Sequence, residues 1–138
     1  MCKQSARKSQ AGFTLVELMI VVVIIAVLSM VAIPAYNDSV NKGRRADAKS
    51  TLTTLAAKEE QFFMDNKQYT ADFTKLGYAA SSNVDSIDAH YTVSAVATAT
   101  TFTLKATPKH DDVECNAFTI TELGEQNITG TSTAQLCW

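Results

Sequence analysis

The sequence is poor in residues that interrupt regular structure and in residues that carry chemistry. Its 138 positions include five glycines, two prolines, one tryptophan and two histidines. It shows no phosphate-binding loop, dinucleotide fingerprint, nucleophile elbow or paired-carboxylate cleft, and His90 and His110 lack the further ligands of a metal site. We therefore expect no enzyme activity, no cofactor and no metal site.

Charge of either sign is also sparse. Twelve basic and 14 acidic residues give a formal net charge of −2, and three of the basic residues lie within the first 12 positions. This balance makes nucleic acid the least supported class of partner. One small basic cluster, Lys42, Arg44 and Arg45, is interpreted as a solvated helix face or a contact with lipid phosphates, and a DNA contact is the less favoured alternative.

What the sequence does contain is a long apolar run near its start. Residues 18–33 carry no charge, and Ser29 is their only polar side chain. As a helix, residues 13–36 are about 36 Å long, enough to cross a bilayer. A secretory signal is one alternative, but the run exceeds the usual signal core and no small-x-small cleavage site follows. A plain membrane anchor is the other. We expect a single-pass span with its N-terminus in the cytoplasm.

One acid, Glu17, lies in the first turn of this apolar helix. A carboxylate costs about 2.5–3.5 kcal/mol at the middle of a bilayer and less near its surface, so it usually has a partner. The simple interpretation is an interfacial acid favoured by the helix dipole. The functional interpretation needs a nearby cation.

The residues around this acid supply such a cation. The junction Gly12-Phe13-Thr14-Leu15-Val16-Glu17-Leu18 resembles the prepilin processing site of type IV pilins. The resemblance implies that residues 1–12 are a leader peptide, that a prepilin peptidase cuts between Gly12 and Phe13, and that Phe13 is then N-methylated. It also implies that Glu17 is the assembly carboxylate, with the freed Phe13 amine as its partner, and that Pro34 kinks or locally melts the helix.

The helix is expected to continue to residue 65, with an amphipathic second half. Its apolar stripe recurs at helical spacing and predicts packing on a sheet, while Lys49, Lys58, Glu59 and Glu60 fall largely off the stripe. The stripe residues are Ala48, Leu52, Leu55, Ala56, Phe62 and Phe63.

Three later segments alternate apolar and polar residues and predict strands. These are residues 90–96, 101–107 and 117–123, separated by turn residues. They indicate an α+β fold in which a long N-terminal helix packs on an antiparallel meander of three to four strands, with residues 37–138 forming the globular domain. This arrangement resembles the pilin fold. Residues 69–77, 118–124 and 137–138 look closer to minor pilins of the type IVa system.

The three cysteines divide between the leader and the domain. Cys2 would leave with the leader, whereas Cys115 and Cys137 form an even pair in a domain expected to be exported. A bond between them would close a loop of about 22 residues, worth roughly 3 kcal/mol. The alternative is two buried free thiols. Just before this cysteine pair, His110-Asp111-Asp112 is expected to be a solvated turn that leads into Cys115.

Together these features predict a structural subunit of a type IV pilus, most consistent with a minor pilin. Its expected location is the inner membrane as a precursor and the extracellular pilus after assembly. The resemblance implies other pilin subunits, the prepilin peptidase/methyltransferase and an inner-membrane assembly platform as partners. The alternatives are a major pilin, a type II secretion pseudopilin, and a DNA- or surface-binding module at a pilus tip.

Overall fold

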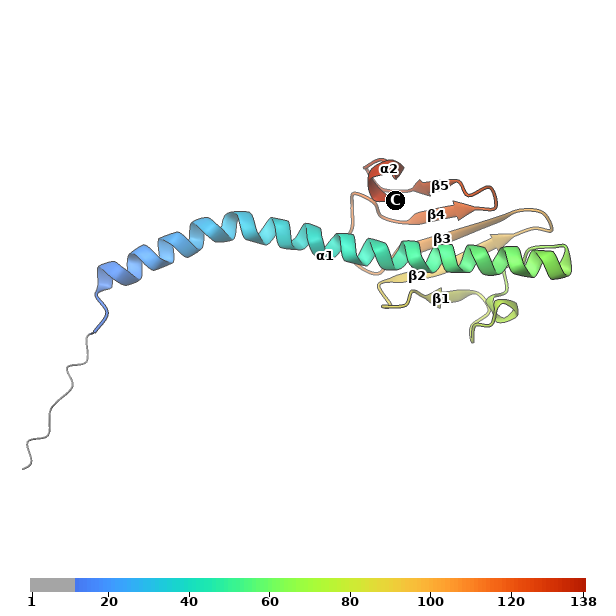
Figure 1. Ribbon diagram of the computed structural model, residues 1–138, viewed down its shortest axis with the longest axis horizontal. Helices are drawn as coiled ribbons and strands as arrows, with labels where there is room; N and C mark the ends of the chain where they lie inside the picture. Colours follow the sequence, from blue (N-terminus) through green and yellow to red (C-terminus); the bar gives the residue numbers. More distant parts are fainter. Residues whose placement is uncertain (1–11) are drawn as a thin grey trace, which may run out of the picture. The chain divides into compact units, whose positions relative to one another are not determined.

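The computed structural model describes residues 12–138 (Figure 1). Apart from Gly12, the expected leader lies outside the described residues, and so does Cys2. The chain divides into two compact units at Asp38–Ser39. In order, the elements are α1 (Leu15–Asn66), the 3-10 helix η1 (Phe73–Leu76), β1 (Asn83–Asp85), β2 (Tyr91–Ala97), β3 (Phe102–Pro108), β4 (Phe118–Thr121), β5 (Gln126–Ile128) and α2 (Ala134–Cys137).

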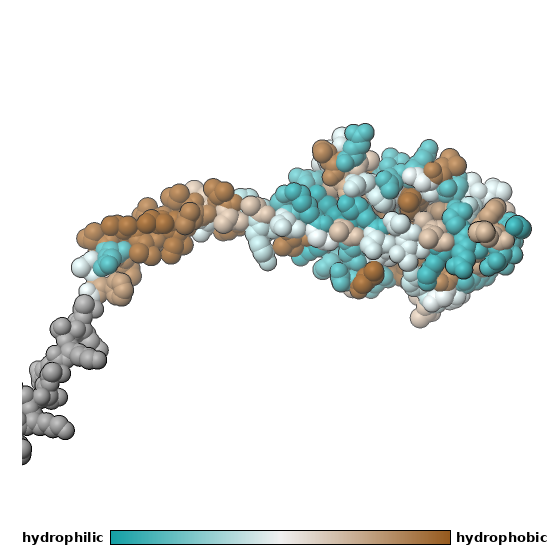
Figure 2. Space-filling model, viewed as in Figure 1, coloured by the Kyte–Doolittle hydropathy of each residue, from teal (hydrophilic) through white to brown (hydrophobic). Residues whose placement is uncertain are grey.

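The first unit contains the apolar part of α1. Its large apolar side chains are exposed, and Figure 2 shows them as a continuous brown surface. Ser29 donates a hydrogen bond to the carbonyl of Ile25 at 2.7 Å, so the polar side chain within the run is satisfied by its own helix. Within residues 12–138, α1 is the one helix long and apolar enough to cross a membrane.

The helix is unbroken through Pro34. No turn is therefore melted at residues 30–34, contrary to one of the two expected effects of this proline. The expected kink stays a prediction.

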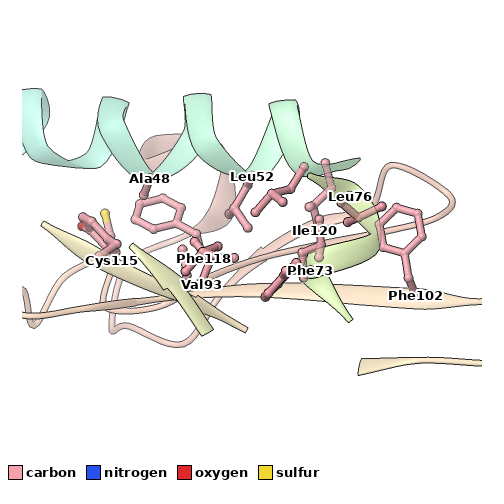
Figure 3. Packing of buried hydrophobic residues seen from close by; sticks show 14 of the residues in the cluster. Ala48, Leu52, Phe73, Leu76, Val93, Phe102, Cys115, Phe118 and Ile120 are labelled. Atoms are coloured by element: carbon pink, nitrogen blue, oxygen red, sulfur yellow. The ribbon is translucent and has the colours of Figure 1, made fainter. Parts of the chain in front are cut away.

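The second unit is built on the amphipathic half of α1. Ala48, Leu52 and Leu55 are completely buried in the core. Figure 3 shows Ala48 and Leu52 on the side of the helix that faces the sheet, where Val93 and Phe118 lie. Burial of these side chains supplies the main driving force for docking helix on sheet. The predicted stripe is confirmed here.

The stripe continues at its edge with more exposed residues. Ala56 and Phe62 pack partly buried against the core, and Phe63 stacks on Tyr69 with ring centroids 4.5 Å apart.

The sheet has five strands in the order β1-β2-β3-β4-β5, with every neighbouring pair antiparallel. The predicted α+β fold and meander are thus confirmed. Strands β2, β3 and β4 match the three predicted segments, and β1 and β5 extend the sheet at its two edges. These additional strands have three residues each, too few for a period-2 pattern to stand out.

The connector between α1 and β1 folds back over the helix. Phe73 is fully buried and Leu76 nearly so, which anchors η1 on the core. The same connector covers Glu59, which is fully buried rather than off the apolar stripe as the sequence indicated. Its Oε2 accepts a hydrogen bond from the backbone N–H of Thr70 at 3.1 Å, whereas its Oε1 has no hydrogen-bond partner in the part of the chain that the structure describes.

Candidate functional site

The predicted processing and assembly residues lie at the start of α1. Gly12, Phe13 and Thr14 precede the helix, and the Phe13 side chain is 86% exposed. The Thr14 Oγ1 accepts a hydrogen bond from the backbone N–H of Glu17 at 3.2 Å. This is one half of a capping box, in which a threonine precedes a glutamate by three positions.

The capping geometry gives Glu17 a structural role in addition to its predicted assembly role. An acid in the first turn of a helix is favoured by the dipole, and Thr14 satisfies one of the free N–H groups there. Thr14 was missed as a functional residue at the level of sequence, although its spacing to Glu17 carries the signal. The cleavage after Gly12, the methylation of Phe13 and the ion pair of Glu17 stay predictions.

The second group of predicted residues is at the C-terminal disulfide. Cys115 and Cys137 are joined, with Cα atoms 5.7 Å apart, and both are buried. The predicted disulfide is therefore present, rather than two free thiols. The bond ties the segment after β3 to α2.

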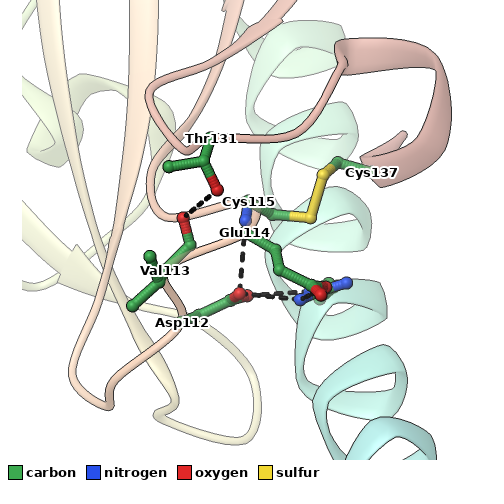
Figure 4. Close-up of polar contacts among 7 residues, drawn as sticks. Asp112, Val113, Glu114, Cys115, Thr131 and Cys137 are labelled. Carbon is green, nitrogen blue, oxygen red and sulfur yellow. Dashed lines mark hydrogen bonds and ion pairs between the residues drawn. A yellow bond between two sulfur atoms is a disulfide. The ribbon is translucent and has the colours of Figure 1, made fainter.

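Beneath the disulfide, α1 holds this segment with a buried ion pair (Figure 4). Arg45 donates from Nε to Oδ2 of Asp112 at 2.8 Å and from Nη2 to Oδ1 at 2.7 Å. Nη2 also donates to Glu114 at 3.0 Å, and Asp112 Oδ1 accepts the N–H of Cys115 at 3.2 Å. Arg45 and Asp112 are only 7% and 6% exposed.

These positions correct two expectations. Arg45 was interpreted as part of a solvated basic face, and Asp112 as part of a solvated turn. Each is buried because it neutralises the other in a two-pronged geometry that guanidinium and carboxylate match closely. The basic cluster of residues 42–45 therefore does not form one cationic surface.

The charges of this pair perturb both groups. Burial alone would raise the pKa of Asp112, but the hydrogen bonds from Arg45 and from the Cys115 N–H outweigh it and hold that pKa below its ordinary value. The hydrogen bond to Asp112 raises the pKa of Arg45 further, against the opposing effect of burial. Both groups are therefore charged at neutral pH.

Two further charged residues of α1 each anchor another segment. Lys49 donates from Nζ to the carbonyls of Cys137 and Trp138, at 3.1 and 3.2 Å. Asp47 accepts hydrogen bonds from the Ser86 hydroxyl and from the N–H of Asp88 in the turn between β1 and β2. One stretch of helix, residues 45–49, thus fixes three separate segments of the domain: residues 112–114, residues 86–88 and the end of α2.

The two histidines lie close together, next to Tyr91. The His110 ring packs edge-on against Tyr91, with ring centroids 5.3 Å apart. The His90 ring also contacts His110, with its centroid 6.3 Å from that of His110. Burial, with help from the charge of Arg44, lowers the pKa of His110. Among residues 12–138, no group of three or more His, Cys, Asp or Glu residues could hold a metal ion.

Comparison with protein-family models gives two matches. Residues 34–119 match the family described as "Type IV minor pilin ComP, DNA uptake sequence receptor". Residues 7–33 match the "Prokaryotic N-terminal methylation motif", which spans the junction at Gly12 and Glu17. The first match covers more than half of the chain.

The chain is also similar to several curated proteins. It is 35% identical to "Fimbrial protein EcpC" of Eikenella corrodens over 77 residues, which are 56% of this chain and 50% of that protein. It is 37% identical to "Type IV major pilin protein PilA" of Myxococcus xanthus over 68 residues, 49% and 31% of the two chains. It is 33% identical to "Type IV major pilin protein PilE" of Neisseria gonorrhoeae over 75 residues, which are 54% of this chain and 45% of that protein.

The chain thus spans half the length, or less, of these curated relatives. Its fold agrees with the matches, since a long apolar N-terminal helix continues into a domain in which the helix packs on an antiparallel sheet. The match over residues 34–119 shows that this chain belongs to the type IV pilins, within the family of the minor pilin ComP.

Proposed function

We propose that this pilin is a minor subunit of a type IV pilus that binds DNA for uptake. One observation carries the proposal: the match over residues 34–119 is to a family whose description names both a minor pilin and a DNA uptake sequence receptor. Family membership implies a structural, non-enzymatic subunit. The methylation motif and the apolar helix fit a precursor in the inner membrane that becomes part of an extracellular pilus.

The minor status can be tested by counting subunits. Filaments sheared from cells should contain this chain at a small fraction of the copy number of the most abundant pilin, measured by quantitative mass spectrometry. A copy number equal to that of the most abundant subunit would assign it to the major pilins instead.

The DNA-binding activity can be tested with the full mature chain in detergent micelles. We expect it to bind fragments of its own organism's genomic DNA, with an affinity that falls as salt rises because phosphate contacts release counterions. Unrelated DNA of the same length is the matched comparison and should bind more weakly. Absence of any salt-dependent binding would refute the DNA-binding part of the proposal.

We also infer the route by which the subunit enters a filament. A prepilin peptidase would cut between Gly12 and Phe13 and methylate the new N-terminus, and an inner-membrane assembly platform would insert the subunit beside other pilins. The Phe13 amine then supplies a cation for Glu17 in an apolar setting, where such a pair is stronger than in water although desolvation offsets part of the gain. The methylation-motif match over residues 7–33 supports this route.

Three substitutions separate the steps of this route. Gly12→Val should leave the precursor uncut, because a side chain would obstruct the extended backbone in the peptidase. Glu17→Ala should be cut normally yet enter filaments poorly. Thr14→Ala removes the helix cap but keeps the carboxylate, so it should enter filaments at close to the wild-type level. Equal assembly defects in Thr14→Ala and Glu17→Ala would show that Glu17 acts by stabilising the start of the helix rather than by pairing with the Phe13 amine.

A further inference from the structure

One face of the sheet is covered by α1, and the other is formed by side chains that alternate outward from the five strands. The residues on this second face, which we call the outward face, are Asn83, Asp85, Thr92, Ser94, Val96, Thr103, Lys105, Thr107, Thr119, Thr121 and Asn127. Eight of them carry a hydroxyl or an amide, and none is aromatic.

The outward face is nearly free of negative charge, although the chain as a whole is acidic. Of the 14 acidic residues, only Asp85 belongs to it. The Oδ1 of Asp85 is 2.7 Å from the ammonium of Lys109 and also accepts a hydrogen bond from Thr92 at 3.2 Å. This carboxylate is therefore neutralised locally, and an approaching polyanion would meet little repulsion.

The remaining charge on the outward face is the ammonium group of Lys105, on the central strand β3. Strand register places Asn83, Ser94, Lys105, Thr119 and Asn127 side by side in one row, with a residue from each strand. Lysine, hydroxyl and amide groups are the side chains that usually contact phosphate and sugar in DNA complexes. At about 4.8 Å per strand the row spans roughly 19 Å, enough to reach phosphates on both sides of a major groove about 12 Å wide.

We propose that the outward face is the surface on which this pilin docks the phosphodiester backbone of double-stranded DNA, with Lys105 as its central phosphate contact. The proposal rests on the proposed DNA-binding function and adds its location and the form of the ligand. Unpaired bases are normally held by stacking on aromatic side chains. Because the outward face has none, it suits duplex rather than single-stranded DNA.

The test measures binding of the full mature chain to a 30-base-pair duplex across a salt series. Lys105→Gln should weaken binding about three- to tenfold and reduce the salt slope by about one phosphate contact. Thr119→Glu and Ser94→Glu place a carboxylate on either side of Lys105 and should each weaken binding at least as much. A single strand of the same sequence should bind more weakly than the duplex.

Matched controls carry the same changes elsewhere in the domain. Thr53→Glu, on the exposed surface of α1, and Lys67→Gln, just after the helix, should bind like the wild type. Thermal melts check that each variant is folded, and if Thr119→Glu is not, Lys105→Gln and Ser94→Glu still decide the question. In parallel, duplex should protect Lys105 from acetylation more strongly than it protects Lys67.

Four results would overturn the proposal. Wild-type affinity in the outward-face variants would place DNA elsewhere and leave the DNA-binding function intact. Equal losses of affinity in the control variants would show a general effect of charge. Tighter binding of the single strand would contradict the inference that a face without aromatic side chains prefers duplex. If the wild type binds no DNA at all, the proposed DNA-binding function fails first, and the docking surface with it.

Discussion

Arg45 and Asp112 form a two-pronged ion pair across 67 positions of sequence, with donor–acceptor distances of 2.8 and 2.7 Å. The pair joins α1 to the residues just before Cys115, and the Asp112 carboxylate also accepts the Cys115 N–H. The segment that ends at Cys115 is thus attached to α1 by charge as well as to α2 by a covalent bond. Removing either partner leaves a charge buried in the domain.

Asp112→Asn should therefore lower the free energy of unfolding by about 3 kcal/mol. The pKa of Asp112 is lower in the folded state than in the unfolded chain, so its contribution is present above about pH 4 and is lost as pH falls through the folded pKa. Urea denaturation at pH 7 and at pH 3 should show a large difference between wild type and variant at pH 7 and a smaller one at pH 3.

The exposed ion pair of Lys109 and Asp85 is the control for this measurement. Both side chains are about half exposed, so Asp85→Asn should change stability much less than Asp112→Asn does. Combining Arg45→Met with Asp112→Leu should recover much of the loss, since hydrophobic residues can replace a buried pair. Additive losses in that double variant would argue against a direct interaction.

Glu59 is a buried acid in the opposite situation, because no cation among residues 12–138 pairs with it. Burial raises its pKa, the hydrogen bond from the Thr70 N–H offsets part of that effect, and Oε1 has no hydrogen-bond partner. Glu59→Gln should raise the free energy of unfolding at pH 7, because the amide oxygen keeps the Thr70 bond and no charge is buried.

The sign of this effect follows from the raised pKa. The folded state binds the Glu59 proton more tightly than the unfolded chain, so the wild type loses stability as pH rises above the unfolded pKa, about 4.3. The gain from Glu59→Gln should thus disappear below pH 4 in thermal melts. Glu125→Gln, at an exposed position away from Glu59, is the control. If Glu59→Gln raised the free energy of unfolding by the same amount at pH 4 and at pH 7, the charge argument would be disproved.

Apolar periodicity was enough to predict most of the architecture. The stripe at Ala48, Leu52 and Leu55 and the alternation in β3 repeat often enough to reveal their period, and both are buried as expected. Strands β1 and β5 have three residues each, so neither shows a period on its own. They are held in place by hydrogen bonds to β2 and β4.

The charged anchors were not predictable in the same way. A charged residue on a helix is exposed unless a distant partner neutralises it, and sequence does not show which partner comes near. Arg45 meets Asp112 only because the segment after β3 returns to α1. Lys49 meets the Cys137 carbonyl only because α2 also returns to this helix. Thr14 differs, because its cap is local and its spacing to Glu17 could have been recognised.

The disulfide should add stability that the buried ion pair does not replace. Reduction frees a loop of 22 residues in the unfolded chain, which costs about 3 kcal/mol and should lower the melting temperature on the order of 10 °C. Melts with and without reductant measure this effect. The double variant Cys115→Ala/Cys137→Ala is the control and should not respond to reductant, while identical melts of the wild type in both conditions would show that the bond adds nothing.

Two glycines should respond in opposite directions to the same substitution. A Cβ at Gly130 would overlap the backbone carbonyl of Glu114, because the segment after β5 runs directly against residues 114–115 and Gly130 donates to the Cys115 carbonyl at 3.2 Å. Gly130→Ala should therefore lower the free energy of unfolding by about 2 kcal/mol. Gly43 lies within α1 with open space around its Cα, so Gly43→Ala should raise it by about 1 kcal/mol. Urea denaturation of the two variants measures both effects, and changes of the same sign would contradict the close backbone approach at Gly130.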